Sequence, residues 1–291
     1  MAGLLPYLRL LRAGTLFSPA ADVVAGACIV AAGAAAPWSV ELARAAGASV
    51  LLYAAGMVWN DVADRREDAV QRPERPIPSG AIGLPAAVAL GALLLAAGCA
   101  LSPTGYRTHH GLIAALVLAY DFACKRNALA GAATMGVLRG LNLAVAAAPA
   151  YAEAPRSLLA AAVCYALYIV AVTILGTFED QQRVRPRAVV AIQTGPLVAA
   201  FAGLLAVQGG LWPAPALALL PIVAFGRRNR LVQQWDQPAI RRSMMFLLLG
   251  TMGYTALLCG AAGRWDGAAA VLLCIPAARA VTGALRQRAL T

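Results

Sequence analysis

Long apolar stretches restrict the fold of this sequence more than any other feature. They recur along the whole chain, each about 15 to 22 residues long, close to the roughly 20 that cross hydrocarbon as a helix. With 61% hydrophobic and 13% charged residues, the chain has more apolar surface than a soluble core can hide. Because unpaired backbone groups are not tolerated in lipid, the stretches are expected to be helices rather than strands. The sequence therefore predicts an all-α, polytopic membrane protein with nine to ten transmembrane helices, within the segments 15–36, 43–60, 81–101, 107–124, 130–150, 157–178, 187–208, 211–227, 242–262 and 266–285.

The distribution of lysine and arginine supports this layout and predicts its orientation. The positive-inside rule places the segments rich in these residues on the cytoplasmic side. Of the 24 lysines and arginines, nineteen fall in alternate connections and at the two termini, four fall on the opposite side, and Arg139 lies within a span. Both termini are therefore predicted to be cytoplasmic. Topology and anionic lipid headgroups account for the net charge of +11, so the lipid bilayer is the expected partner and nucleic acid is not.

The stretch NDVADRREDAVQRPERPIPSG, residues 60–80, gathers charges of both signs between two apolar segments. If the preceding helix continues past Asn60, then Asp61, Asp64 and Asp68 lie at i, i+3 and i+7 and share one face. Hard divalent cations prefer carboxylate oxygens, and Mg²⁺ completes its coordination with water and phosphate. The stripe of aspartates therefore suits a metal diphosphate. The alternative is a solvated acidic helix end that forms ion pairs with its own arginines.

The aspartate pattern and the run RPERPIPSG that follows it resemble the first aspartate-rich motif of the UbiA superfamily, the intramembrane prenyltransferases. The opening YLRLLRAGTLF is similar to the first helix of that family, and YDFACKRN is similar to its Tyr…Lys-Arg segment. The resemblance implies transfer of a prenyl group from a prenyl diphosphate to an aromatic or other lipid-soluble acceptor, with Mg²⁺ between the aspartates and the diphosphate. It also implies a UbiA-type helical bundle with a central cavity that opens to the cytoplasm.

The resemblance assigns roles to individual residues. It implies that Asp61, Asp64 and Asp68 are catalytic and hold Mg²⁺, and that Asn60 orients the site or contacts the diphosphate. Fixed positive charges would neutralise the leaving diphosphate as the carbon–oxygen bond breaks. The residues in this role are Arg72, Lys125 and Arg126.

A second aspartate-rich cluster, usual in the family after the sixth span, is incomplete in this sequence. The segment reads LGTFEDQQRV, in which Glu179 and Asp180 remain while threonine and valine stand where further aspartates are expected. The resemblance implies that Glu179 and Asp180 contact the substrate and that Asp180 is a further metal ligand. The alternative is that these acids pair with Arg183 or Arg185.

Two ionisable residues lie inside apolar segments, where charges are costly and commonly functional. Asp22 lies about two turns into the first segment, and Arg139 lies in the middle of the fifth. The two are predicted to pair, with Asn142 assisting beside Arg139. The alternative is that Arg139 and Asn142 bind the diphosphate or the acceptor.

The cysteines and histidines predict no metal framework. The six cysteines fall in or at the ends of apolar segments, without a Cys-x-x-Cys pair, and are expected to be reduced thiols. His109 and His110 lack the partner spacing of a zinc site and are predicted to be loop residues.

Three functions remain open from the sequence. The first is Mg²⁺-dependent prenyl transfer by a single membrane domain over 1–291, located in the cell membrane, inner or plasma, with its active site on the cytoplasmic side. The others are non-catalytic binding or transport of a prenylated lipid, and terpene cyclisation within the membrane. The segments YLRLLRAGTLFSPAADVVAG, MGVLRGLN and LYIVAVTILG are most similar to a divergent branch, the EboC-like proteins, whose reaction is poorly defined. That similarity leaves the acceptor open.

Overall fold

The computed structural model describes residues 3–32, 37–179, 185–207, 213–230, 232 and 235–287. Across these ranges the chain is helical and has no strand, which confirms the predicted all-α class. The helices are α1 (Leu4–Leu10), η1 (Ala13–Thr15), α2 (Phe17–Val30), α3 (Val40–Ala63), α4 (Arg65–Gln71), α5 (Leu84–Leu101), η2 (Thr104–Tyr106), α6 (Arg107–Phe122), η3 (Cys124–Arg126), α7 (Ala128–Ala144), η4 (Val145–Glu153), α8 (Arg156–Gly176), α9 (Pro186–Val207), α10 (Pro213–Arg230), α11 (Gln237–Ala261) and α12 (Trp265–Gln287).

Each of the ten predicted apolar segments overlaps one of the long helices. Among the described residues, eight helical segments are long and apolar enough to cross a membrane. The other two predicted segments correspond to α6, which has 16 residues, and to α10, whose 18 residues end in a cluster of arginines. The positions of the helices are thus confirmed, and the count of nine to ten membrane crossings stays a prediction.

The chain divides into two compact units. The first consists of Met1–Ala20, Trp38–Ala123 and Leu273–Thr291, and the second consists of Ala21–Pro37 and Cys124–Leu272. Helices α2 and α12 contribute residues to both units. A single domain over the whole chain therefore stays a prediction, and each unit is described separately below.

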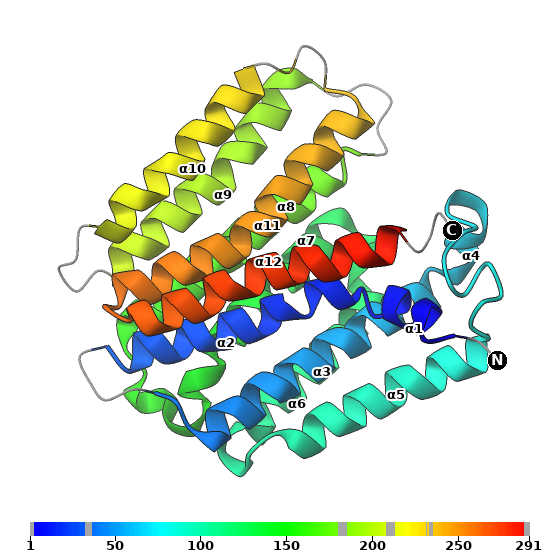
Figure 1. Cartoon of the computed structure of the whole chain (residues 1–291), viewed down its shortest axis with the longest axis horizontal. Coiled ribbons are helices and arrows are strands. Elements are labelled where there is room, and N and C mark those ends of the chain that lie inside the picture. Colours follow the sequence, from blue (N-terminus) through cyan, green and yellow to red (C-terminus); the bar gives the residue numbers. More distant parts are fainter. Residues whose placement is uncertain are drawn as a thin grey trace. The chain divides into compact units, whose positions relative to one another are not determined.

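In the first unit, α5 and α6 both pack against α3 (Figure 1). Small residues allow the close approach, as expected for helices in lipid. A Cβ atom at Gly98 of α5 would lie 2.9 Å from the Leu52 side chain, and one at Gly91 would lie 2.9 Å from the Trp59 ring. The Trp59 ring also meets Phe122 of α6 edge-on, with centroids 5.8 Å apart. This packing holds the C-terminal end of α3, which carries the aspartate motif.

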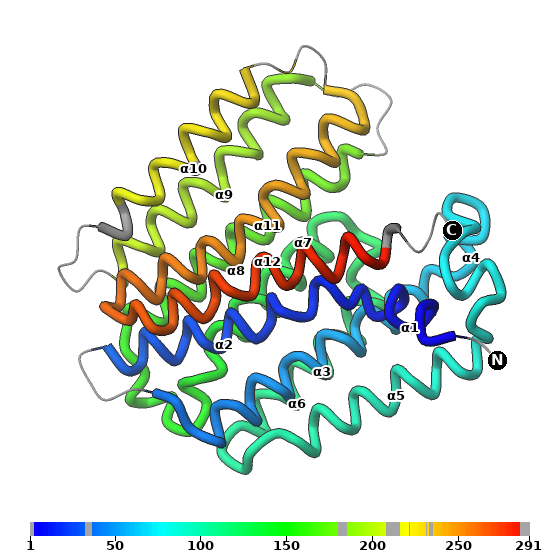
Figure 2. Tube along the Cα trace, viewed as in Figure 1, coloured from blue at the N-terminus to red at the C-terminus, as the bar shows by residue number. Residues whose placement is uncertain are grey.

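In the second unit, α8 packs against both α7 and α9, and α11 packs against α8, α9 and α10 (Figure 2). Glycines again mark the tightest contact. A Cβ atom at Gly136 of α7 would lie 2.6 Å from the carbonyl oxygen of Ala166 on α8. One at Gly140 would lie 2.8 Å from the carbonyl oxygen of Ala162. The backbones of α7 and α8 therefore lie almost in contact.

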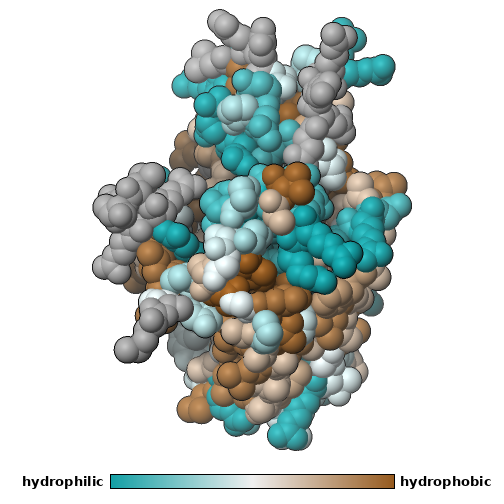
Figure 3. Space-filling view, turned by 90° about the vertical axis from the view of Figure 1, so that its right-hand side faces the viewer, coloured by the Kyte–Doolittle hydropathy of each residue, from teal (hydrophilic) through white to brown (hydrophobic). Residues whose placement is uncertain are grey.

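Large apolar side chains cover much of the outer surface. Leu93, Val198 and Leu273 each expose about two thirds or more of their surface, at 65%, 66% and 72%. Figure 3 shows broad areas of hydrophobic side chains on one face of the molecule. Apolar surface on this scale is unfavourable in water and matches the acyl chains of a bilayer. The chain is a multi-pass membrane protein.

Candidate functional site

The aspartate motif begins on the last turn of α3, as predicted. The helix continues past Asn60 to Ala63, and Asp64 joins it to α4 with φ −86° and ψ 1°. The i to i+4 hydrogen bonds continue across this junction: Asp64 N–H donates to Asn60 O, and Asp68 N–H donates to Asp64 O, both at 2.9 Å. Asp61 and Asp68 consequently point to a common partner, which confirms the shared face for these two, whereas the predicted place of Asp64 on that face stays a prediction.

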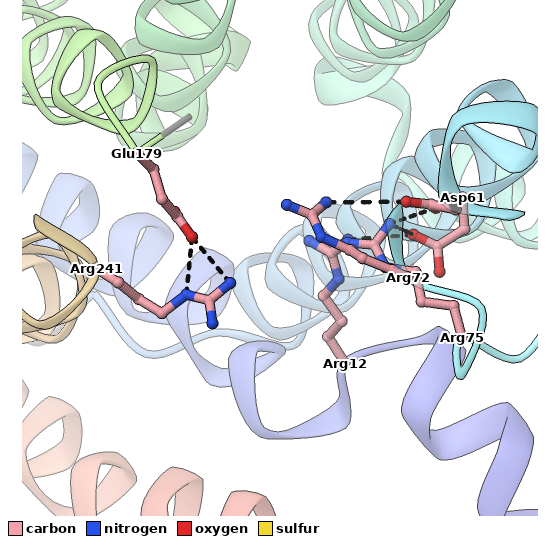
Figure 4. Close-up of polar contacts among 7 residues, drawn as sticks. Arg12, Asp61, Arg72, Arg75, Glu179 and Arg241 are labelled. Atoms are coloured by element: carbon pink, nitrogen blue, oxygen red, sulfur yellow. Dashed lines mark hydrogen bonds and ion pairs between the residues drawn. The ribbon is translucent and has the colours of Figure 1, made fainter. Parts of the chain in front are cut away.

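That partner is Arg75, whose Nη1 lies 3.3 Å from Asp61 Oδ1 and 2.6 Å from Asp68 Oδ2. Arg12 Nη2 donates to Asp61 Oδ1 at 3.1 Å, and Arg72 Nη1 lies 3.8 Å from Asp68 Oδ1 (Figure 4). Asp61 and Asp68 are only 4% and 2% exposed. Buried charges must be paired, and here three guanidinium groups compensate two buried carboxylates. The predicted alternative of ion pairs with nearby arginines is therefore present, at the position expected for the metal.

Two of these arginines were absent from the predicted site. Arg75 lies in the turn after α4, where Ser79 N–H donates to the Arg75 carbonyl at 2.9 Å and Gly80 adopts φ +74°. Arg12 precedes η1 in a left-handed conformation, φ 48° and ψ 50°. This conformation is uncommon for a residue with a side chain and is often found at functional sites. Arg75 belongs to the run RPERPIPSG, which could have indicated its place in the site. Arg12 follows α1, and no local sequence pattern there indicates a contact with Asp61.

The remaining residues of the predicted metal site, Asn60 and Asp64, are half-buried at the same end of α3. Within the described ranges, no three acidic, histidine or cysteine side chains are grouped closely enough to hold a metal. The donor chemistry nevertheless fits Mg²⁺, because two buried carboxylates already converge on one positive charge, the guanidinium of Arg75. Binding of the metal between them would require Arg75 to move.

The predicted diphosphate ligands Lys125 and Arg126 lie in η3 of the second unit, where Lys125 is half-buried and Arg126 is exposed. Asn127 caps the following helix, since its Oδ1 accepts from the backbone N–H groups of Leu129 and Ala130 at 3.0 Å. Gly131 lies against the backbone of Lys125, and a Cβ atom there would approach Lys125 Cα to 3.0 Å. The cap and the glycine hold η3 against the start of α7. Contact of Lys125 and Arg126 with a diphosphate stays a prediction.

The predicted pair inside the membrane is confirmed. Asp22 Oδ2 of α2 lies 3.1 Å from Arg139 Nη1 of α7 and accepts from Asn142 Nδ2 at 2.9 Å. Tyr165 of α8 completes the cluster, since its hydroxyl donates to Asp22 Oδ1 at 2.9 Å and accepts from Arg139 Nη2 at 2.6 Å. All four side chains are buried. Arg139 and Asn142 are thus engaged with Asp22, and their binding of substrate stays a prediction.

The second acidic motif is only partly described. Glu179 follows α8, and its Oε1 accepts from Arg241 Nε at 2.9 Å and Nη2 at 2.8 Å (Figure 4). Arg241 comes from α11, whereas the sequence suggested Arg183 or Arg185 as partners. Asp180 and Arg183 lie outside the described residues, so the role of Asp180 as a metal ligand stays a prediction. Because Arg241 is 59% exposed, this ion pair contributes little to stability.

The histidines predicted as loop residues lie instead in α6 and are buried. His110 Nδ1 is 2.7 Å from Ser102 Oγ, and its Nε2 is 3.2 Å from Ser49 Oγ. The loop prediction was wrong because these hydroxyl groups, supplied by α3 and by the end of α5, satisfy both ring nitrogens inside the bundle.

Comparison with known proteins identifies the family of this chain. The model of the UbiA prenyltransferase family matches residues 22–250, well over half of the chain. The chain belongs to the UbiA prenyltransferase family. Its membership confirms the resemblance drawn from the aspartate motif, while the finer similarity to the EboC-like branch stays a prediction.

Relatives of this UbiA family member include the digeranylgeranylglyceryl phosphate synthase of Ignicoccus hospitalis, 35% identical over 130 residues. That match covers 43% of this chain and 41% of the relative, so the chain matches about two fifths of the relative's length. A solved structure concerning digeranylgeranylglyceryl phosphate synthase in membranes has a TM-score of 0.63 and 19% identity, covering 91% of this chain and all of the other. The apo structure of a UbiA homolog from Aeropyrum pernix K1 also has a TM-score of 0.63, with 22% identity over 87% of this chain and 97% of that one. At these identities, the two structures establish the fold of this UbiA family member.

Proposed function

We propose that this UbiA family member transfers a prenyl group from a prenyl diphosphate to a lipid-soluble acceptor within the membrane. The observation that carries the proposal is the pair of buried aspartates, Asp61 and Asp68, joined by Arg75 at the end of a membrane helix. Burying such a cluster is costly, and replacing buried ion pairs by apolar residues is often neutral or stabilising. A role in binding a charged ligand gives a reason for its presence.

The reaction begins with cleavage of the bond between the first prenyl carbon and the diphosphate oxygen, whose electron pair leaves with the diphosphate. The resulting allylic cation bonds to the acceptor, which then loses a proton. When bound by Asp61, Asp64 and Asp68, Mg²⁺ would stabilise the negative charge that develops on the leaving group.

The guanidinium groups of this cluster are suited to the same task. Arg12, Arg72 and Arg75 now bind carboxylate oxygens, and the planar guanidinium binds phosphate oxygens with the same geometry. Each guanidinium could therefore exchange a carboxylate oxygen for a diphosphate oxygen and keep the same kind of hydrogen bond. In this proposal Asn60, Lys125 and Arg126 add further contacts to the diphosphate, and Asp180 adds a metal ligand.

Two further parts of the proposal concern the acceptor and the side of the membrane. A matching relative is named as the synthase of digeranylgeranylglyceryl phosphate, which favours a lipid acceptor. The aspartates belong to the end of α3 that the positive-inside rule assigns to the cytoplasm. We therefore place the active site on the cytoplasmic side. The incomplete second acidic motif, in which threonine and valine stand where further aspartates are expected, favours the second candidate, a protein that binds a prenylated lipid without reaction.

The proposal is tested by Mg²⁺-dependent diphosphate release from prenyl diphosphates of several lengths, with purified protein in lipid nanodiscs. Asp68→Asn should abolish release, because it removes a ligand charge without changing the shape of the side chain. Glu67→Gln is the matched control, since Glu67 is an exposed neighbour on α4 and its loss should leave release unchanged. Wild-type release by Asp68→Asn would contradict the proposed metal role. Binding without release would favour the lipid-binding candidate, and a cyclic hydrocarbon formed without acceptor would identify a terpene cyclase.

A further inference from the structure

Two buried thiols meet where α2 and α11 end. Cys28 lies in the last turn of α2, Cys259 lies in the last turn of α11, and neither exposes any surface. The side chains of both residues lie beside Gly267, near the start of α12. Nothing in the spacing of the six cysteines predicted this pair, because the two residues come from helices far apart in sequence.

The start of α12 leaves room for both sulfur atoms. A side chain at Gly267, the third residue of α12, would collide with Cys28 Sγ and would also lie 3.4 Å from Cys259 Sγ. Both sulfur atoms therefore lie close to Gly267. A residue without a Cβ atom at this position allows the two thiols to approach each other.

Water reaches the turn beside the pair. Arg264, in the connection from α11 to α12, and Asp266, in the first turn of α12, form an ion pair with Nη2 and Oδ2 2.7 Å apart, and the Asp266 side chain is 46% exposed. The thiols are thus buried but lie next to a polar boundary, which a small reagent can reach when the helix ends open locally.

The orientation of α11 places this boundary away from the cytoplasm. Arg241 and Arg242 lie in the first turns of α11, which the positive-inside rule assigns to the cytoplasmic side, and Cys259 lies at the opposite end. Compartments outside the cytoplasm allow disulfides to form and persist. The location of the pair therefore suits oxidation.

We propose that Cys28 and Cys259 are a modification site, a dithiol that closes to a disulfide and links α2 to α11. The two thiols together lose two protons and two electrons as the sulfur–sulfur bond forms. A small-molecule disulfide accepts them by thiol–disulfide exchange and is released as two thiols. The link would anchor the helix that carries Asp22, and it is independent of the proposed prenyl transfer.

The test counts free thiols in the full-length protein before and after incubation with oxidised glutathione. The protein is then denatured and labelled with N-ethylmaleimide, and its intact mass is measured by mass spectrometry. Reduced protein should take up six labels, one for each cysteine, and oxidised protein should take up two fewer. Peptide mapping should place the disulfide between Cys28 and Cys259.

Two serine variants make the count specific. Cys259→Ser should show the same number of labels before and after oxidation, because the pair is gone. Cys99→Ser is the matched control: Cys99 is exposed on α5, so this variant should still lose two labels on oxidation. Six labels on oxidised wild-type protein, or a disulfide mapped to another pair, would overturn the proposal.

Discussion

Replacing Asp22 by asparagine is predicted to destabilise the protein far more than removing a carboxylate at its surface. Both oxygens of Asp22 are engaged, with Arg139 Nη1 at 3.1 Å and with Asn142 and Tyr165 at 2.9 Å each. Asparagine keeps the shape but loses the negative charge, so the guanidinium of Arg139, only 8% exposed, would be left uncompensated. Breaking a buried ion pair by removing one partner costs about 3 to 5 kcal/mol.

That cost corresponds to a decrease in Tm on the order of 10 °C, at roughly 2 to 4 °C per kcal/mol for chains of about this size. The assay is thermal unfolding of the purified protein in detergent, followed by tryptophan fluorescence. Asp266→Asn is the matched control, because the Asp266 side chain is 46% exposed to solvent and the loss of its charge should leave Tm unchanged. The double variant Asp22→Leu with Arg139→Leu should recover most of the loss, since no unpaired charge remains. Unfolding of Asp22→Asn at the wild-type temperature would refute this reasoning.

Two further predictions concern the aspartate cluster and the helix packing. Arg75→Met should tighten the binding of Mg²⁺ alone, as measured by titration calorimetry, because the metal no longer has to displace a guanidinium. A hydrogen bond to a charged group contributes about 1.5 to 3 kcal/mol, which corresponds to roughly ten- to a hundredfold in affinity. Unchanged or weaker binding would show that Arg75 and the metal do not compete. Gly136→Ala should lower the unfolding free energy by about 1 to 3 kcal/mol, because its Cβ would lie 2.6 Å from a carbonyl oxygen of α8. Gly111→Ala, with no atom within 4 Å of its Cβ, should be neutral or stabilising in the same thermal assay, and equal effects of the two changes would contradict the packing argument.

The helices and the buried charge pair were predictable because both depend on local rules. The length and apolar character of the segments marked all ten long helices, and the cost of a charge in lipid predicted that Asp22 and Arg139 would pair. The spacing of the aspartates likewise placed Asp61 and Asp68 on one face once α3 continued past Asn60.

The partners supplied by distant elements were not predictable in the same way. Arg12 reaches Asp61 from a strained backbone position after α1, and Arg241 reaches Glu179 from α11. Neither contact has a signal in sequence spacing, because it depends on how the helices pack. The same holds for His110, whose two serine partners come from other helices. Local patterns therefore identified the candidate site and left its electrostatic state undetermined.

The sharing of one guanidinium by two buried carboxylates bears on the order in which ligands bind. In the proposed function, a metal ion that arrives alone would have to displace Arg75 from Asp61 and Asp68 and would leave that cation without these two counter-ions. In the proposed function, a diphosphate that arrives alone would withdraw the same cation, leaving Arg12 as the partner of Asp61 and Arg72 as the partner of Asp68. When both arrive together, the carboxylates would exchange the Arg75 guanidinium for the metal, and the guanidinium would exchange carboxylate oxygens for phosphate oxygens. Under the proposed function, a cluster of this kind would therefore favour joint binding of the metal and the diphosphate over binding of either one alone.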